Sequence, residues 1–346
     1  MGRISSDQHF LNIFMGFIAT VFFVVIMKEL KGIFVPFFLA LLLYFLFNGV
    51  VSRLIYFKIP KAVVLLLLLV FIFIILYSFG MLMFSGASSF IDKFPAYSSK
   101  ISEVFKDITS RLNIPLEEVQ TQINSMDWAK IIHKGTSIIS TTFGSFASFM
   151  GNLIFVLIFL LFMLGGRDGL VVRMNKAFNE RRSDELLTIL RSIENQVQHY
   201  LVLKTFISLI TAFLSGIILY FGGFDFLLFS SLLIFALNFI PNIGSVIATA
   251  FPIITGLIKF GFSLRILLVL VGLMFIQMVM GNIIEPKIAG KSLNLSPMII
   301  LLSLIFWGYI WGIIGMILAV PLTSAIKIIF GHIEALKPIS ELISAD

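Results

Sequence analysis

The stretch Asn238-Phe239-Ile240-Pro241-Asn242-Ile243-Gly244-Ser245 interrupts an apolar segment that otherwise runs from Phe226 to Phe260. As one straight helix, that segment would be about 52 Å long, well beyond a hydrocarbon core of about 30 Å. Each half alone would be about 22 Å, which is too short to cross easily. Pro241 fixes φ and Gly244 permits a positive φ, so the interruption has the chemistry of a turn. We therefore predict a re-entrant helical hairpin with its tip at residues 241–244.

A second apolar segment, from Met298 to Phe330, is interrupted in a similar way. Interrupted segments leave backbone groups that lipid cannot satisfy, so they persist only where they face protein or a water-filled cavity. In transporters they mark the transport site, often as two hairpins of opposite orientation. The alternative is that each segment crosses the membrane once as a bent helix. The small residues and proline of the second segment suit close helix packing, and we assign that role to Gly308, Gly312, Gly315 and Pro321.

The composition places the chain in a membrane. Of its 346 residues, 59% are hydrophobic and 12% are charged, whereas a soluble domain averages about 25% charged residues. We expect an all-α, polytopic helical membrane protein with about six full spans and the two broken segments, about eight membrane segments in all. The full spans are expected at residues 10–27, 33–51, 62–84, 148–164, 201–222 and 266–284.

Several other protein classes are excluded or disfavoured. The chain has no cysteine, so disulfides and thiolate metal sites are excluded, and its four histidines are scattered. No phosphate-binding loop appears, which argues against an ATP-driven pump, and we expect no metal, no cofactor and no enzymatic activity. The net charge of +7 comes from basic residues beside apolar spans, where they set topology and meet anionic lipid. We therefore do not expect nucleic acid as a partner.

Three regions follow from these patterns. Residues 1–84 form a three-span region, 85–145 an extramembrane amphipathic helical segment, and 146–346 a transport region that includes a polar helix at 167–199. Residues 85–145 have two interpretations: a helical hairpin packed on the membrane region or on a neighbouring subunit, or a cap that captures substrate. We favour the packed hairpin, which is the simpler one. Lysine and arginine gather in 52–61 and 167–199, so both segments and both termini are predicted to be cytoplasmic. The segment 85–145, with Lys28 and Lys31, then lies outside.

The polar residues near the breaks are the candidate solute pathway. A buried amide or hydroxyl needs a partner, so these side chains should face a cavity or another helix. Glu285 has two interpretations: an interfacial loop residue that pairs with Lys287 or Lys291, or a carboxylate for protons or cations at the mouth of the pathway. We predict that it is not the sole coupling carboxylate. The candidates are Asn238, Pro241, Asn242, Gly244, Ser245, Gln277, Asn282, Glu285, Lys287 and Asn294.

Three motifs stand out, at residues 238–244, 282–297 and 311–322. They resemble the signatures of the autoinducer-2 exporter family of bacterial and archaeal membrane proteins. The stretch Leu201-Val202-Leu203-Lys204, which follows Tyr200, departs from the glycine-containing sequence that is usual at this position in the family. The resemblance implies a multi-pass protein of the cell membrane and a homo-oligomer, with a pentamer as one form. Family members have been assigned export of the quorum-sensing signal autoinducer-2, and others sodium or proton antiport.

The leading functional prediction is a secondary transporter that exports a small polar organic solute resembling autoinducer-2. Its hydroxyl groups would bind the amides and the hydroxyl of the candidate pathway. One alternative is a sodium (or other monovalent cation)/proton antiporter that uses Glu285. A second alternative is a membrane scaffold that transports nothing and binds partners through residues 85–145.

Overall fold

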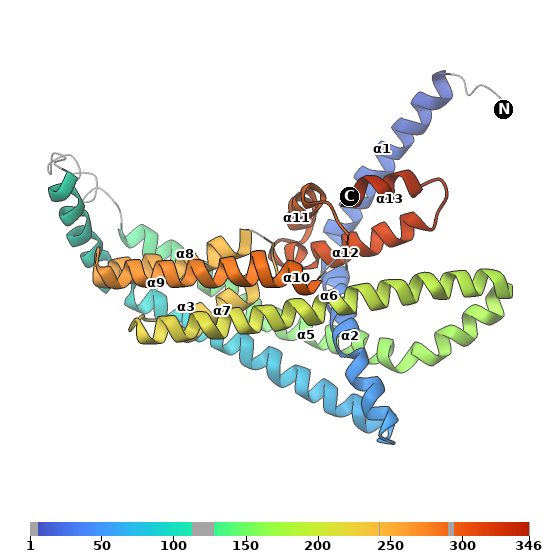
Figure 1. Ribbon diagram of the computed structural model, residues 1–346, viewed down its shortest axis with the longest axis horizontal. Helices are drawn as coiled ribbons and strands as arrows, with labels where there is room; N and C mark the ends of the chain where they lie inside the picture. Colours follow the sequence, from blue (N-terminus) through green and yellow to red (C-terminus); the bar gives the residue numbers. More distant parts are fainter. Residues whose placement is uncertain (1–5, 113–127, 242, 290–293, 346) are drawn as a thin grey trace. The chain divides into compact units, whose positions relative to one another are not determined.

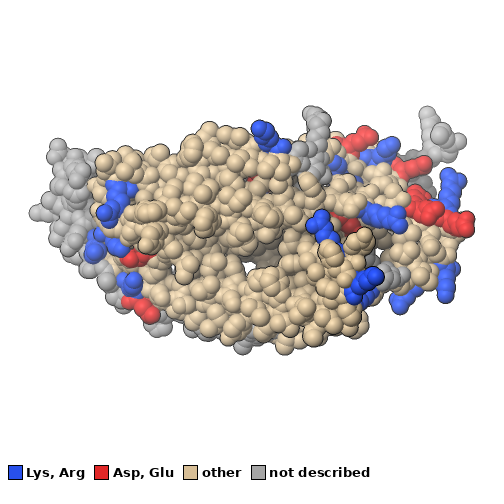
Figure 2. All heavy atoms as spheres, turned by 60° about the horizontal axis from the view of Figure 1, so that its bottom comes forward, with Lys and Arg blue, Asp and Glu red and all other residues tan. Residues whose placement is uncertain are grey.

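The computed structural model describes residues 6–112, 128–241, 243–289 and 294–345, and these are almost entirely helical (Figure 1). Within those ranges, six helices are long and apolar enough to cross a membrane, and a bent pair of helices, Gly151–Gly166 and Gly169–Ala177, adds a seventh if it counts as one span. The face in Figure 2 is correspondingly made mostly of uncharged side chains. This confirms the polytopic helical membrane class. The six helices that are long and apolar enough to cross a membrane are Lys31–Tyr56, Lys61–Lys93, Glu180–Phe221, Ile243–Phe260, Leu264–Ile288 and Ile313–Gly331.

The chain forms two compact units, each built from separated parts of the sequence. The first unit contains Met1–Arg53, Asn152–Val197 and Leu293–Asp346, and the second contains Leu54–Gly151 and Gln198–Ser292. This grouping cuts across the regions 1–84, 85–145 and 146–346, which remain a prediction about how the chain is organised.

The first two helices differ from the sequence prediction. Helix α1 (Ser6–Glu29) and helix α2 (Lys31–Tyr56) are separated by Leu30 alone, and α2 continues from α1 in Figure 1. Helical hydrogen bonds run through the junction, from Leu30 N–H to Ile26 C=O at 2.9 Å and from Phe34 N–H to Leu30 C=O at 3.0 Å. No loop therefore separates residues 10–27 from 33–51, because Lys28, Glu29, Leu30 and Lys31 are good helix formers and the helical hydrogen bonds continue past Gly32.

Helices also extend without interruption past the expected membrane boundaries. Helix α3 (Lys61–Leu112) has no break at residues 84–85, so it runs into the predicted extramembrane segment 85–145. Residues 113–127 lie outside the described residues, and the last part of that segment belongs to α5 (Trp128–Ala177). The segment 167–199 is not a separate helix as predicted: it contains the end of α5, a turn, and the start of α6 (Glu180–Phe221). Asn179 caps α6, since its side-chain Oδ1 accepts from Arg182 N–H at 3.2 Å.

Both predicted interruptions are present. Helix α7 (Leu227–Leu237) ends before the first break and α8 (Ile243–Phe260) follows it, while α11 (Pro297–Trp311) and α12 (Ile313–Gly331) meet at Gly312. The helices of each pair pack against one another, as a hairpin requires. The first pair has unequal halves of 11 and 18 residues. Helix α8 is thus long enough to cross a membrane by itself, contrary to the estimate for two equal halves.

The glycines of the two hairpins have different physical roles. Gly244 does not have a positive φ, which corrects the turn argument made for it. A Cβ at Gly244 would lie 1.7 Å from the carbonyl oxygen of Leu237, and one at Gly315 would lie 1.9 Å from that of Trp307. Each glycine therefore lets the second helix of its hairpin approach the backbone of the first.

Gly312 is the turn residue of the second hairpin rather than a packing residue. Its φ is 66°, and a Cβ there would have no neighbour within 4 Å. Gly308 and Pro321 occupy packed positions as expected: a Cβ at Gly308 would lie 3.0 Å from Met316 Cγ, and Pro321 is buried inside α12.

The remaining helices follow each hairpin. After α8, the chain continues as α9 (Leu264–Gln277), a π-helical segment η1 (Met278–Ile284) and α10 (Glu285–Ala289). After α12, the short α13 (Lys337–Ile343) folds back, and its end pairs with the start of α11 through Ser296 N–H and Ile343 C=O at 3.0 Å.

Candidate functional site

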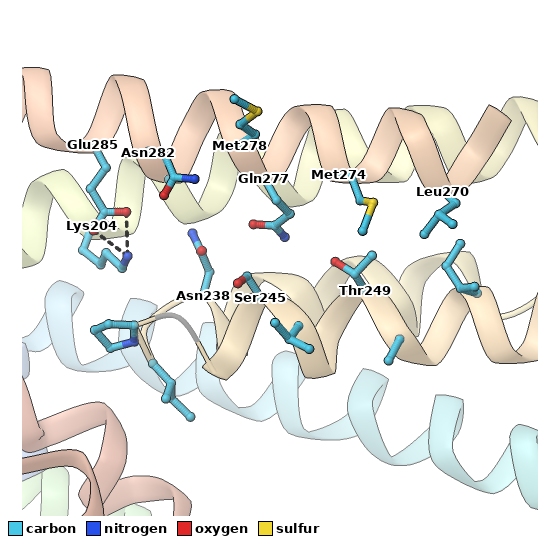
Figure 3. A pocket seen from close by; sticks show the side chains of 16 residues that line it. Lys204, Asn238, Ser245, Thr249, Leu270, Met274, Gln277, Met278, Asn282 and Glu285 are labelled. Atoms are coloured by element: carbon cyan, nitrogen blue, oxygen red, sulfur yellow. Dashed lines mark hydrogen bonds and ion pairs between the residues drawn. The ribbon is translucent and has the colours of Figure 1, made fainter. Parts of the chain in front are cut away.

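A cavity of about 640 Å³ lies in the second unit, between the α7–α8 break and the helical run α9–η1–α10 (Figure 3). In the close-up, side chains from the two walls point toward each other across the gap. The polar residues that line it are Lys204, Asn238, Ser245, Thr249, Gln277, Asn282 and Glu285. The cavity thus joins residues from α6, from both sides of the first break, and from the π-helical region.

An ion pair lies at one end of this cavity. Lys204 Nζ donates to both carboxylate oxygens of Glu285, at 2.6 and 2.8 Å, and the Lys204 side chain is only 4% exposed. Removing an ammonium from water without giving it a partner costs on the order of several kcal/mol of desolvation free energy. The charged Lys204 side chain can therefore lie in this buried position only because Glu285 pairs with it. Sequence reasoning proposed Lys287 or Lys291 as the partner of Glu285. Instead Lys287 is exposed, and Lys291 lies outside the described residues.

Lys204 was missed, although the sequence carries a signal for it. It is the one charged residue of the apolar stretch from Tyr200 to Phe221, and an ionisable residue inside a span is a functional candidate by default. Its partner could not be read from the sequence, because Glu285 is 81 positions away on another helix.

The π-helical segment orients the second wall of the cavity. In an α-helix, Gln277 and Asn282 would point about 140° apart, since five residues turn the helix by about 500°. The wider turn of η1 brings both side chains to the cavity, and the Glu285 N–H bonds to Met280 C=O, five residues back. Short π-helical segments occur frequently at functional sites.

Two amides in the cavity have different surroundings. Asn238 is buried and donates from Nδ2 to Ser208 Oγ at 3.0 Å, so α6 anchors it. Gln277 Nε2 is buried, and no acceptor among the described residues reaches it. A buried donor without a protein partner beside a polar cavity is a position for a bound water or solute oxygen.

The cavity changes in polarity along its length. In Figure 3, the Lys204–Glu285 pair lies at one end and Leu270 at the other, with Gln277 between them. Ile253 and Ala250 also line the cavity, and they follow Thr249 along α8, away from the break. A ligand that fills the cavity therefore meets charged and amide groups at one end and hydrocarbon at the other.

The candidates from the sequence separate into two groups. Asn238, Pro241, Ser245, Gln277, Asn282 and Glu285 line the cavity. The others do not line it or are not described. Gly244 is buried at the start of α8, Lys287 is exposed, and Asn242 lies outside the described residues. Asn294 belongs to the first unit, where its carbonyl oxygen accepts from Ala345 N–H at 3.1 Å.

The other end of the α7–α8 hairpin is held by a polar cluster around Asp225. Its carboxylate accepts from Lys259 Nζ at 2.7 Å and from the Tyr97 hydroxyl at 2.9 Å. Burial alone raises the pKa of Asp225, but the hydrogen bonds from Lys259 and Tyr97, with the charges of Lys259 and Lys93, lower that pKa overall. The cluster ties α8 and the α6–α7 turn to α3, so it fixes the hairpin from the end opposite the break.

Comparison with known proteins places the chain in a family. The family model described as AI-2E family transporter matches residues 16–335. The chain belongs to this family. AI-2 transport protein TqsA of Escherichia coli strain K12 is 32% identical over 314 residues, which are 90% of this chain and 89% of TqsA.

Two further relatives match over a similar extent. A protein of Borreliella burgdorferi is 32% identical over 330 residues, 95% of this chain and 89% of its own length. One of Haemophilus influenzae is 31% identical over 323 residues, 91% of this chain and 90% of its own. Their names propose transport without a substrate. The chain is therefore a multi-pass membrane protein of a transporter family, in agreement with the resemblance carried by its motifs.

Proposed function

We propose that this protein is a secondary transporter that exports a small polar organic solute through the cavity at the first helix break, with an autoinducer-2-like molecule as the leading substrate. The observation that carries the proposal is the cavity itself. Its volume of about 640 Å³ lies within the usual range for small-molecule sites, and its polar groups converge from separate helices. Membership of the transporter family and the name of the relative TqsA support the assignment.

The lining favours a neutral solute with several hydroxyl groups. The two ionic groups of the cavity, Lys204 and Glu285, compensate each other, so the described lining carries no net charge. Glu285 can accept from hydroxyls, while Gln277 and Asn282 offer both donors and acceptors. The hydrocarbon near Leu270 would accommodate a short alkyl group at the other end of the solute.

A cation/proton antiporter is the second candidate, and the position of Glu285 favours it. Glu285 lies in the helical candidate span Leu264–Ile288 rather than in a loop, and it lines the cavity. In this mechanism, protons or sodium ions would compete with Lys204 for the carboxylate. In Glu285→Gln protein that still folds and assembles, an antiporter would then lose transport completely, whereas a solute exporter would keep part of its activity.

The test is solute flux in proteoliposomes that contain the purified full-length protein. Flux of labelled autoinducer-2 is measured with and without a proton or sodium gradient, for the wild type and for Gln277→Leu. Solute flux that Gln277→Leu impairs supports the proposal. Ion exchange in the absence of solute supports the antiporter, and no flux of either kind leaves the scaffold alternative and contradicts both transport mechanisms.

The topology and the assembly are part of the same proposal. We infer that both termini and the α5–α6 turn are cytoplasmic, that residue 100 is on the outer side of a prokaryotic cell membrane, and that the protein is a homo-oligomer. Arg182 and Lys100 are both exposed, and the chain contains no cysteine. Single cysteines at these two positions should therefore react with membrane-impermeant reagents from opposite sides. Reaction of both from the same side would contradict the topology.

A further inference from the structure

A second cavity, of about 690 Å³, lies within the first unit, where α2 meets the hairpin formed by the end of α5 and the start of α6. Most of its wall is hydrocarbon, contributed by Leu41 and Phe45 of α2, Phe162 and Leu170 of α5, and Leu190 of α6. Phe162 is 73% exposed and Leu170 is 47% exposed, so the groove is open at its side. The transport proposal uses none of these residues.

The groove also carries cationic groups. Arg173 and Arg191 line it, and in the described part of the chain neither guanidinium forms an ion pair. The acid in the lining, Glu194, accepts from the Tyr44 hydroxyl at 2.6 Å. Two arginines against one glutamate leave the lining with a net charge of +1. An occupant must therefore combine hydrocarbon with negative charge.

The position of the groove along α5 suits a membrane interface. The apolar helix Gly151–Gly166 bends by 64° into Gly169–Ala177, and Phe162 lies in the last turn before the bend. Arg173 follows Gly166 by seven residues, about 10 Å of helix. The hydrocarbon wall is thus at the end of an apolar helix that is a candidate span, and the guanidiniums follow it, in the order that hydrocarbon and headgroup have in a lipid. Arg181 and Arg182 on the adjoining turn add to the basic character of this side.

We propose that this groove binds one anionic phospholipid, with an acyl chain along Phe45, Phe162 and Leu170 and the headgroup phosphate between Arg173 and Arg191. Arginine matches phosphate through paired N–H donors. Basic pockets between membrane helices on the cytoplasmic side are known sites for anionic headgroups. A lipid held there would link α2 to the α5–α6 hairpin, because its acyl chain would contact α2 and its headgroup would contact α5 and α6.

The experiment measures lipid retained by the purified full-length protein, by native mass spectrometry after titration with phosphatidylglycerol or with phosphatidylcholine of the same acyl chains. The test variant is Arg173→Gln/Arg191→Gln. The matched control is Arg181→Gln/Arg182→Gln, which removes the same charge from exposed arginines outside the groove. We expect phosphatidylglycerol affinity to fall about tenfold or more in the test variant and to change little in the control.

Two further arms keep the result interpretable. Arg173→Lys/Arg191→Lys retains the charge and should keep part of the affinity, so a general loss of folding in the glutamine variant is distinguishable. Glycerol phosphate, which has the headgroup chemistry without acyl chains, should not displace the bound lipid. The proposal is overturned if the test and control variants lose phosphatidylglycerol affinity equally, or if glycerol phosphate displaces the bound lipid. It is also overturned if phosphatidylglycerol and phosphatidylcholine are retained equally, or if the test variant changes the mass of the oligomer but not the amount of bound lipid, since the arginines would then act between subunits.

Discussion

Removing one partner of the Lys204–Glu285 pair should have unequal effects, depending on which partner remains. Glu285→Met leaves the Lys204 ammonium uncompensated at 4% exposure, and breaking a buried pair in this way costs about 3–5 kcal/mol of unfolding free energy. Lys204→Met leaves the Glu285 carboxylate, which is 23% exposed and faces the cavity, so water can solvate it and the cost should be about 1–3 kcal/mol. We therefore expect Glu285→Met to be the more destabilising change.

The double variant Lys204→Met/Glu285→Met tests the reasoning further. Replacing both ions by apolar side chains of similar length is often neutral, so its stability should return to within about 1 kcal/mol of the wild type. Solute flux should nevertheless remain low, because the polar end of the cavity is gone. The assay is chemical unfolding of the purified protein in detergent, together with flux in proteoliposomes.

Two outcomes would contradict this account of the pair. Equal destabilisation by the two single variants would mean that the difference in solvent access between Lys204 and Glu285 has no energetic effect. A double variant that is stable and transports normally would show that the pair is structural and that the solute does not contact it.

Three other perturbations have definite expected outcomes. Gly244→Ala should destabilise the protein by about 2 kcal/mol or more, because its Cβ overlaps the Leu237 carbonyl oxygen, and thermal unfolding measures this; an unchanged midpoint would contradict the close approach. Gln277→Leu should leave stability unchanged or higher, because it removes a buried unpaired donor, while lowering solute affinity in binding or flux assays. The depressed pKa of Asp225 contributes stability that is present above the unfolded pKa of about 3.9 and is lost as pH falls through the folded value. The stability difference between wild type and Asp225→Asn should therefore be constant from about pH 5 to 7 and shrink in more acidic solution; a difference that is independent of pH down to about 3 would contradict it.

The features that the sequence predicted depend on local chemistry. A chain with this excess of apolar residues has no soluble alternative, so the helical membrane class followed from composition. The first break followed from Pro241, because proline fixes φ. The second followed from the glycines and the proline of its segment as a group, although Gly312 itself was assigned to packing and not to the turn. Asn238 and Gln277 were recognised because an amide in an apolar helix needs a partner wherever the helix packs.

The tertiary structure decided what depends on groups that are distant along the chain. Glu285 pairs with Lys204 and not with a neighbouring lysine, since packing places α10 beside α6. Gly244 is required by a carbonyl oxygen of the preceding helix, not by its own φ. Gln277 and Asn282 share the cavity only because the backbone between them adopts a π-helical turn. Residue type and spacing therefore identified the helices and their breaks, whereas the contacts that form the site depend on which helix faces pack together, and spacing along one helix does not determine that.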